Sequence, residues 1–237
     1  MDGTLSTGRS RGWQPLATLL VLAAAGGLGC STFKGTTAAS YLLKIRKDPD
    51  PNARFLAYEQ LASPRCYDNE DQKAEAVKAL ISKLDGAQEP VATRAVICRT
   101  LGELRDPSAR EAILKATSDP EGFVRVQACR ALGKVGRAED ATVLARIMAV
   151  DSLEDCKVAS IEGMAELQAI DPRIFEVLIN GMDHDDPAIR LASLQALRKI
   201  TGKDLGVEPG PWRQALTPTP TPPQPETASS ATPGARK

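Results

Sequence analysis

The sequence predicts an all-α protein, an α-solenoid of about five antiparallel helix pairs that ends in a disordered C-terminal tail. One helical motif occurs five times along the 237-residue chain, and every copy has an apolar stripe with the period of an α-helix. In addition, aromatic residues make up only 4% of the chain, and Ala and Leu supply most of its apolar side chains. Such a composition suits thin helical layers better than a thick globular core.

The motif is clearest at residues 119–136, where it predicts a turn followed by a helix. Each copy contains one basic residue that serves as its anchor: Arg54, Arg94, Arg125, Lys157 and Arg190. Small or apolar residues follow each anchor by one, four and seven positions, and by ten positions in the last four copies. These offsets draw one stripe along a helix. Successive anchors are 40, 31, 32 and 33 residues apart, which is typical of a helical repeat array.

A further helix is expected before the anchored helix of each copy. In the first copy, Tyr41, Leu42 and Ile45 form a short apolar face, and Pro51 is expected to open the anchored helix. The corresponding residues of the later copies are Val77, Leu80, Ile81 and Leu84; Ile113 and Ala116; Val143, Leu144, Ile147 and Met148; and Ile174, Val177 and Leu178. A single pair of helices cannot bury both of its faces, so the pairs are predicted to stack.

Residues 1–29 have the features of a targeting segment. Arg9 and Arg11 precede an apolar run at 16–29, which is shorter than the roughly 20 residues that a membrane-spanning helix needs. The end of this run, Leu-Gly-Cys30, resembles the lipobox of bacterial lipoproteins, in which the cysteine is lipidated and becomes the mature N-terminus. The resemblance implies a lipidated Cys30 and, with Ser31 after it, export to the outer membrane of a Gram-negative cell. An ordinary signal peptide and an uncleaved anchor are the alternatives.

The repeats resemble HEAT repeats, in particular the short class found in phycobilisome-lyase-like proteins. The resemblance covers about residues 48–202 and is most specific at 119–133. It implies that an acidic turn residue and the basic residue six positions later form a hydrogen-bonded ladder between neighbouring repeats. The pairs that match are Asp48 and Arg54, Asp119 and Arg125, and Asp151 and Lys157, whereas Gln88 precedes Arg94 and His184 precedes Arg190. Small residues eight positions after the anchors are expected to let neighbouring helices pack closely: Ala62, Gly102, Gly133 and Ala165.

The surface positions five residues after the anchors form a candidate partner-binding row, which we call the offset-five row. It consists of Glu59, Arg99, Arg130, Glu162 and Gln195. In HEAT arrays the second helices line the concave face, so the resemblance implies that a protein partner could meet this row. The alternative is an ordinary solvated helix face. A second candidate is the polar insertion at residues 63–73, for which a plain connecting loop is the alternative.

Two segments follow the last repeat. Residues 200–216 resemble the Thr-Gly-x-Asp…Pro…Trp segment that closes many bacterial HEAT-repeat proteins, and Trp212 is expected to cover the end of the array. Residues 217–237 consist mainly of Thr, Pro, Ser and Ala, which predicts a disordered tail. The expected organisation is therefore a signal peptide at 1–29, a repeat array at 30–203, a capping segment at 204–216 and a tail at 217–237.

No arrangement of residues in the sequence indicates catalysis, a metal or a cofactor. The chain has 30 acidic and 30 basic residues, and the offset-five row contains charges of both signs. Neither observation indicates binding of nucleic acid. His184 is the only histidine and lies in an Asp-rich turn, where helix capping is its expected role. Cys98 and Cys129 occupy equal positions in adjacent repeats, roughly 8–10 Å apart on packed helices, beyond the reach of a disulfide. Cys66 and Cys156 are expected to be unpaired thiols, at the surface or semi-buried.

The sequence therefore predicts an exported, lipid-anchored scaffold of the cell envelope that binds another protein and has no enzyme activity or small-molecule substrate. Two other interpretations stay open. The resemblance to phycobilisome lyases could indicate attachment or removal of a bilin, although those enzymes act in the cytoplasm and this chain has a secretion signal. The other is a purely structural envelope protein without a specific partner.

Overall fold

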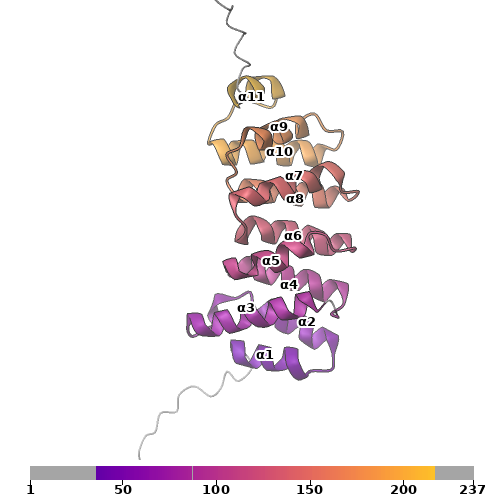
Figure 1. The fold of residues 1–237 in the computed structure, drawn as a ribbon, viewed down its shortest axis with the longest axis vertical. Helices are drawn as coiled ribbons and strands as arrows, with labels where there is room; N and C mark the ends of the chain where they lie inside the picture. Colours follow the sequence, from indigo (N-terminus) through magenta and orange to yellow (C-terminus); the bar gives the residue numbers. More distant parts are fainter. Residues whose placement is uncertain (1–35, 87, 217–237) are drawn as a thin grey trace, which may run out of the picture. The chain divides into compact units, whose positions relative to one another are not determined.

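The computed structural model describes residues 36–86 and 88–216. These residues form eleven α-helices and three short 3₁₀-helices, and this part of the chain contains no strand (Figure 1). The all-α fold class is therefore confirmed. The signal segment at 1–29, the lipidation of Cys30 and the tail at 217–237 lie outside the described residues, so they stay predictions.

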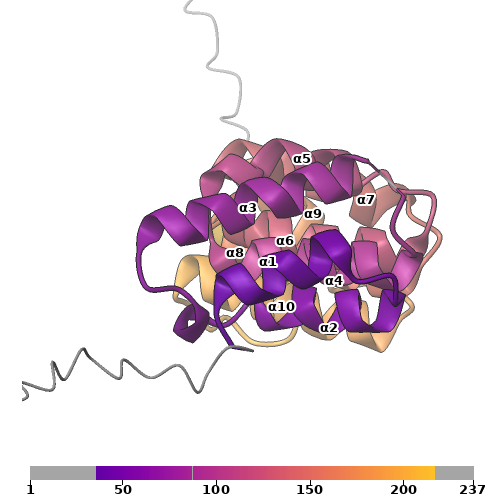
Figure 2. The ribbon, with the colours of Figure 1, turned by 90° about the horizontal axis from the view of Figure 1, so that it is seen from below.

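The first ten α-helices form five consecutive pairs. Their bounds are α1 (Ala38–Lys47), α2 (Pro51–Gln60), α3 (Glu70–Asp85), α4 (Val91–Leu104), α5 (Arg110–Ala116), α6 (Gly122–Val135), α7 (Ala141–Val150), α8 (Glu154–Glu166), α9 (Pro172–Gly181) and α10 (Pro187–Thr201). The anchored helices α2, α4, α6, α8 and α10 pack one upon the next. In Figure 2, α3 and α5 lie toward the top of the view, and α2 and α10 lie toward the bottom. The predicted α-solenoid of five pairs is confirmed.

Asp-Pro pairs begin three of these helices. Pro51, Pro172 and Pro187 occupy the first helical position of α2, α9 and α10, where the missing N–H of proline costs no hydrogen bond. The aspartate before each proline accepts a hydrogen bond from a backbone N–H of the first turn. The prediction that Pro51 opens the anchored helix is therefore confirmed.

The apolar stripe of the anchored helices is the core of the stack. The residues seven positions after the anchors are all fully buried: Leu61, Leu101, Leu132, Met164 and Leu197. Those four positions after the anchors are also buried: Tyr58, Cys98, Cys129, Ile161 and Leu194. Leu191, one position after the last anchor, departs from the stripe and is 55% exposed. No further anchored helix packs on α10 within the described residues, which leaves this side chain uncovered.

Glycines allow the middle anchored helices to approach each other closely. A Cβ atom on Gly133 of α6 would lie 2.7 Å from the Cα atom of Gly163 in α8. A Cβ atom on Gly102 of α4 would lie 2.9 Å from the Cα atom of Ala131 in α6. Both distances are too short for a methyl group, so the backbone spacing at these two interfaces requires glycine.

The inserted segment differs from the expected polar loop at 63–73. Helix α3 already begins at Glu70, and residues 64–66 form a 3₁₀-helix. Cys66 is only 6% exposed, and the Tyr67 hydroxyl donates to the carbonyl oxygen of Leu61 at 2.6 Å. The segment is thus held to the end of α2 by its own aromatic and thiol side chains. The prediction of a surface or semi-buried position was wrong for Cys66, and also for Cys156, which is fully buried.

Helix α11 (Pro209–Leu216) packs against α9 after the last pair. Trp212 is fully buried there, and its Nε1 donates to the carbonyl oxygen of Gly206 at 2.9 Å. Arg213 reaches back to α9, where it donates to the side-chain oxygen of Asn180 at 3.0 Å. The capping segment therefore contains a helix that the sequence analysis did not predict.

Candidate protein-binding surface

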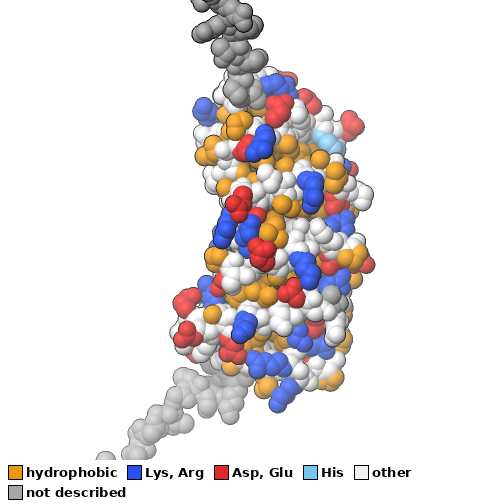
Figure 3. Space-filling model, in the orientation of Figure 1, with side chains coloured by type: hydrophobic (Ala, Val, Ile, Leu, Met, Phe, Trp, Pro, Cys, Tyr) orange, Lys and Arg blue, Asp and Glu red, His pale blue; other side chains and the backbone are white. Residues whose placement is uncertain are grey.

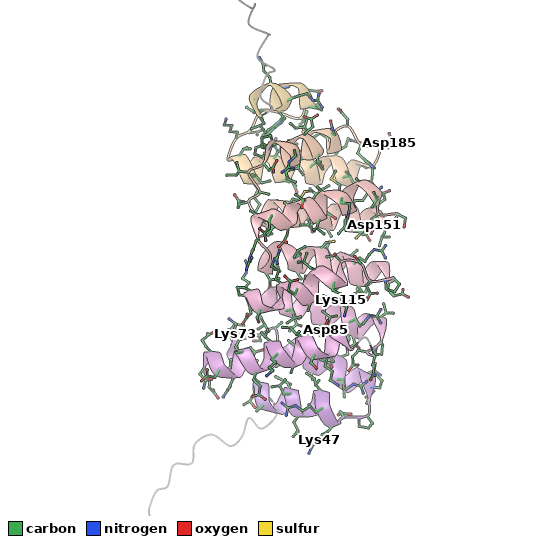
Figure 4. The ribbon with its side chains drawn as sticks, viewed as in Figure 1. Lys47, Lys73, Asp85, Lys115, Asp151 and Asp185 are labelled. Carbon is green, nitrogen blue, oxygen red and sulfur yellow. The ribbon has the colours of Figure 1, made fainter. Side chains whose placement is uncertain are left out.

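The turns between paired helices are joined by arginine side chains. Arg94 donates from Nε and Nη2 to the two carboxylate oxygens of Asp119, at 3.1 and 2.9 Å. Arg125 makes the same two bonds with Asp151, at 2.7 and 2.9 Å. The Nη1 atom of each arginine donates to backbone carbonyl oxygens of its own turn. One guanidinium thus binds its own turn and the next one, and Asp151 lies on the same edge of the stack as Asp185 (Figure 4).

This arginine ladder changes at both ends. Arg54 donates to Glu89 at 3.3 Å, and the Tyr58 hydroxyl donates to the other oxygen of the same carboxylate at 3.0 Å. Glu89 therefore takes the place of an acidic residue at position 88. No repeat precedes Asp48 in the part of the chain that the structure describes, and its carboxylate accepts a bond from the backbone N–H of Asp50 at 3.0 Å.

At the other end, the anchor Lys157 replaces arginine, and His184 occupies the position that is acidic in the matching turns. Lys157 pairs with Glu154 of its own helix at 3.2 Å. Arg190 donates to the carbonyl oxygens of His184 and Asp185, each at 2.8 Å. The bonds of the arginine ladder therefore run from α2 to the turn before α8, and the interface between α8 and α10 lacks a ladder bond. This edge serves the fold, because Arg54, Arg94 and Arg125 are largely buried and already bonded.

The residues of the offset-five row are brought together in pairs. Arg99 lies 2.6 Å from the carboxylate of Glu59, and Arg130 lies 3.0 Å from that of Glu162. All four side chains are 40–49% exposed. Each arginine is therefore balanced by a glutamate on the neighbouring anchored helix, Arg99 toward α2 and Arg130 toward α8. The row lies at the surface, and its arginines already hold carboxylates of the chain itself.

A second charged row, nine positions after the anchors, was missed in the sequence analysis. It consists of Glu103, Lys134, Glu166 and Lys199. Lys134 lies 2.6 Å from Glu103, and Lys199 forms an ion pair with Glu166. The alternation of sign at this offset was a readable signal, because stacked helices place equal offsets side by side.

The two rows border a groove of about 370 Å³ that crosses α6, α8 and α10. Its walls carry both signs of charge, and small residues lie between them. The lining residues are Arg130, Lys134, Glu162, Gly163, Ala165, Glu166, Ala192, Gln195, Ala196 and Lys199. Figure 3 shows acidic and basic side chains interspersed over the face that it displays, with no large area of one sign.

A smaller, mostly apolar hollow of about 60 Å³ lies on α2, α4 and α6. Phe55, Val96 and Phe123 line it, with Arg99 beside them. Phe123 is 56% exposed, although it is one of the few aromatic residues of the chain. An exposed aromatic side chain beside an arginine is a common anchor of protein–protein interfaces. Phe123 lies two positions before the anchor Arg125 and outside the apolar stripe. An aromatic residue at such a position could have indicated this hollow from the sequence.

The described residues contain no cluster of three or more His, Cys, Asp or Glu side chains that could hold a metal ion. His184 accepts a hydrogen bond from the backbone N–H of Asp186 through Nδ1 at 3.0 Å, within the turn before α10. None of the helices within 36–86 and 88–216 is both long and apolar enough to cross a membrane.

Stacked helix pairs, inter-turn arginine bonds and glycine-mediated contacts between anchored helices define a HEAT-like α-solenoid. In agreement, residues 77–165 match the family model of HEAT repeats. No curated protein matches the chain. Among solved structures, the chain is similar to the complex of CpcE and CpcF of phycocyanin lyase from Nostoc sp. PCC7120, with 18% identity and a TM-score of 0.58. The match covers 70% of this chain and 66% of that one. At this identity the similarity supports the fold alone.

Proposed function

We propose that the protein is a lipid-anchored scaffold of the bacterial cell envelope that binds another protein through its anchored helices and performs no catalysis. The observation that carries the binding function is the pair of hollows on the layer of anchored helices. One is bordered by paired charges and the other contains the exposed Phe123. Both lie on the same helix layer, so one partner can contact both.

The ion pairs at the groove suit exchange with a partner. Exposed ion pairs contribute only about 0–1 kcal/mol to stability, so a partner can replace one member of a pair at little cost to the fold. The small residues Gly163, Ala192 and Ala196 leave room between the charged walls for a backbone or a side chain. Arginine can also bind a carboxylate with two bonds or stack on an aromatic ring. A protein segment with both charges and an aromatic or aliphatic side chain fits these features.

The similar structure is itself a complex of two proteins, which supports the binding proposal. It belongs to a phycocyanin lyase, and a bilin lyase-like activity is therefore the second candidate function. We expect the purified protein to leave the absorbance spectrum of an added bilin unchanged. A shifted spectrum, or covalent attachment of bilin to an added phycobiliprotein, would favour the second candidate instead.

The anchor is tested by the chemical state of residue 30. Mass spectrometry of the membrane fraction should find an N-terminal peptide that begins at acylated Cys30 and no peptide from residues 1–29. A Cys30→Ser variant should be absent from the membrane fraction. A soluble wild-type protein with an intact Met1 would exclude the anchor while leaving the binding surface open to test.

Partner binding is tested by crosslinking in intact membranes with the variant Arg99→Glu/Arg130→Glu and, separately, with Phe123→Ala. Both should reduce the recovered partner, and neither should change helicity, because all three side chains are well exposed. The matched control is Arg46→Glu/Arg173→Glu. It also breaks two exposed arginine–carboxylate pairs, with Glu75 and Asp171, but on α1 and α9. Equal recovery from all variants would contradict the proposal. Loss only on changing residues 64–66 would identify the inserted segment as the recognition site.

A further inference from the structure

The thiols of Cys129 and Cys156 are in contact. Their Sγ atoms lie 4.0 Å apart, Cys129 in α6 and Cys156 in the first turn of α8. Both side chains are fully buried, and the hydroxyl of Ser160 lies 3.9 Å from the Cys129 sulfur. The Cys156 thiol also lies beside the ladder pair of Arg125 and Asp151, and its hydrogen bond with the Asp151 carboxylate helps to lower the pKa of that carboxyl. The binding surface uses neither thiol.

The repeat register shows why this pair differs from its neighbours. Cys129 stands four positions after its anchor, and Cys156 stands one position before the next anchor. The same two positions hold Cys98 and Val124 one interface earlier, and Ile161 and Ile189 one interface later; all four are fully buried. In the described stack, cysteine thus occupies both of these positions only at the interface of α6 and α8. The preceding interface has one cysteine and one valine, and the following interface has two isoleucines.

We propose that Cys129 and Cys156 are a disulfide site that closes when the protein folds in an oxidising compartment. The proposal rests on the export proposed above. The oxidant is a disulfide compound or a disulfide-bonded oxidoreductase of that compartment. One thiolate attacks the oxidant and forms a mixed disulfide, and one thiol leaves. The second cysteine then displaces the second thiol. In total, two protein thiols and one oxidant disulfide give one protein disulfide and two oxidant thiols.

The geometry requires a small movement. A disulfide bond is about 2.05 Å long, so the two sulfur atoms must approach each other by roughly 2 Å. Cys98 is fully buried as well, but the residue at the matching position of the next repeat is Val124, so the register leaves it without a partner.

Burial decides when the reaction takes place. Contact between the two sulfurs raises the pKa of Cys156 and lowers that of Cys129. Both side chains are fully buried, so an oxidant in solution cannot reach either thiol in the folded protein. The oxidant must therefore meet the two cysteines while the chain folds or when α6 and α8 separate. After closure the disulfide is shielded from reductants. It fixes the spacing of α6 and α8, the two helices that carry Arg130 and Glu162 at the groove.

The test uses the full chain with Cys30→Ser, so that residue 30 forms no disulfide. The protein is reduced, unfolded, refolded with oxidised and reduced glutathione, and then unfolded again and alkylated with iodoacetamide. Of the four cysteines Cys66, Cys98, Cys129 and Cys156, we expect only Cys66 and Cys98 to be alkylated, and one crosslinked peptide to join residues 129 and 156. The oxidised protein should also melt several degrees higher than the reduced protein.

Two variants keep the test independent of folding defects. Cys98→Ala should retain the 129–156 crosslink. Cys156→Val repeats the valine that the preceding repeat holds at the same position, so it should fold, lose the crosslink and melt equally with and without reductant. Alkylation of all four thiols, disulfides through Cys98, or dimers in place of the internal bond would overturn the proposal. Refolding of the purified protein does not depend on where the protein is located in the cell. If the disulfide forms on refolding but Cys129 and Cys156 are found reduced in cells, the result contradicts the proposed export and supports the disulfide site.

Discussion

Arg125 holds Asp151 of the next repeat with two hydrogen bonds of 2.7 and 2.9 Å, while its third nitrogen binds the carbonyl oxygens of Asp119 and Pro120 at 3.0 Å. Both charged side chains are largely buried, with exposures of 18% and 8%. In a repeat array each repeat contacts only its neighbours. A bond of this kind therefore stabilises one interface directly and the array through it.

Removing the Asp151 carboxylate should destabilise the protein more than removing Asp48. Asp151→Ala leaves the Arg125 guanidinium buried with two unmatched donors, and we expect a loss of about 3 kcal/mol in the free energy of unfolding. Asp48 has the same place in its own turn, but its carboxylate bonds only the local backbone N–H of Asp50. Asp48→Ala removes this one local hydrogen bond and should cost about 1 kcal/mol. Urea denaturation of both variants measures the difference, and equal losses would show that the inter-repeat bonds add nothing.

The same carboxylate makes stability depend on acid. The hydrogen bonds from Arg125 lower the pKa of Asp151 from 3.8 to about 2. Because the folded pKa is below the unfolded one, the associated stability is present above pH 3.8 and is lost as the pH falls toward 2. The linked free energy is about 2 kcal/mol. The stability gap between wild type and Asp151→Ala should therefore narrow between pH 5 and pH 2, as measured by guanidinium denaturation. A constant gap would contradict this assignment.

Alanine at Gly133 should force α6 and α8 apart. The added methyl would lie 2.7 Å from the Cα atom of Gly163, which is backbone and cannot turn aside. We expect a loss of about 1–3 kcal/mol, although alanine is the better helix former by about 1 kcal/mol. A Cβ atom on Gly210 of α11 would have no neighbouring atom within 4 Å. Gly210→Ala should leave the melting temperature unchanged or raise it, and thermal melts of both variants decide the matter.

The two C-terminal truncations should behave differently. A chain that ends at Leu216 keeps the buried Trp212 and should melt like the full chain. A chain that ends at Gly202 loses α11 and uncovers α9. Burial of a large aromatic side chain contributes about 2–3 kcal/mol, so the second truncation should melt several degrees lower. Equal melting temperatures would show that α11 covers nothing of consequence.

The sequence by itself determined the periodic features of this protein. Apolar residues at fixed offsets from Arg54, Arg94 and the later anchors defined the anchored helices, and their spacing defined five stacked pairs. Periodicity is a local property, since a helix with one apolar stripe can bury it only against other helices. The same reasoning found the offset-five row, because a helix face follows from residue spacing alone.

Only the tertiary structure decided which residues of neighbouring repeats meet. Cys129 and Ile161 have equal offsets in α6 and α8, but the sulfur of Cys129 contacts that of Cys156, at the start of α8. The acidic partner of Arg54 is Glu89 rather than residue 88, and Gly133 meets Gly163 rather than Ala165. Crossing angle and axial stagger depend on how side chains of two helices interlock. A single sequence records the surface of each helix, and the stagger between two helices arises only when both surfaces pack.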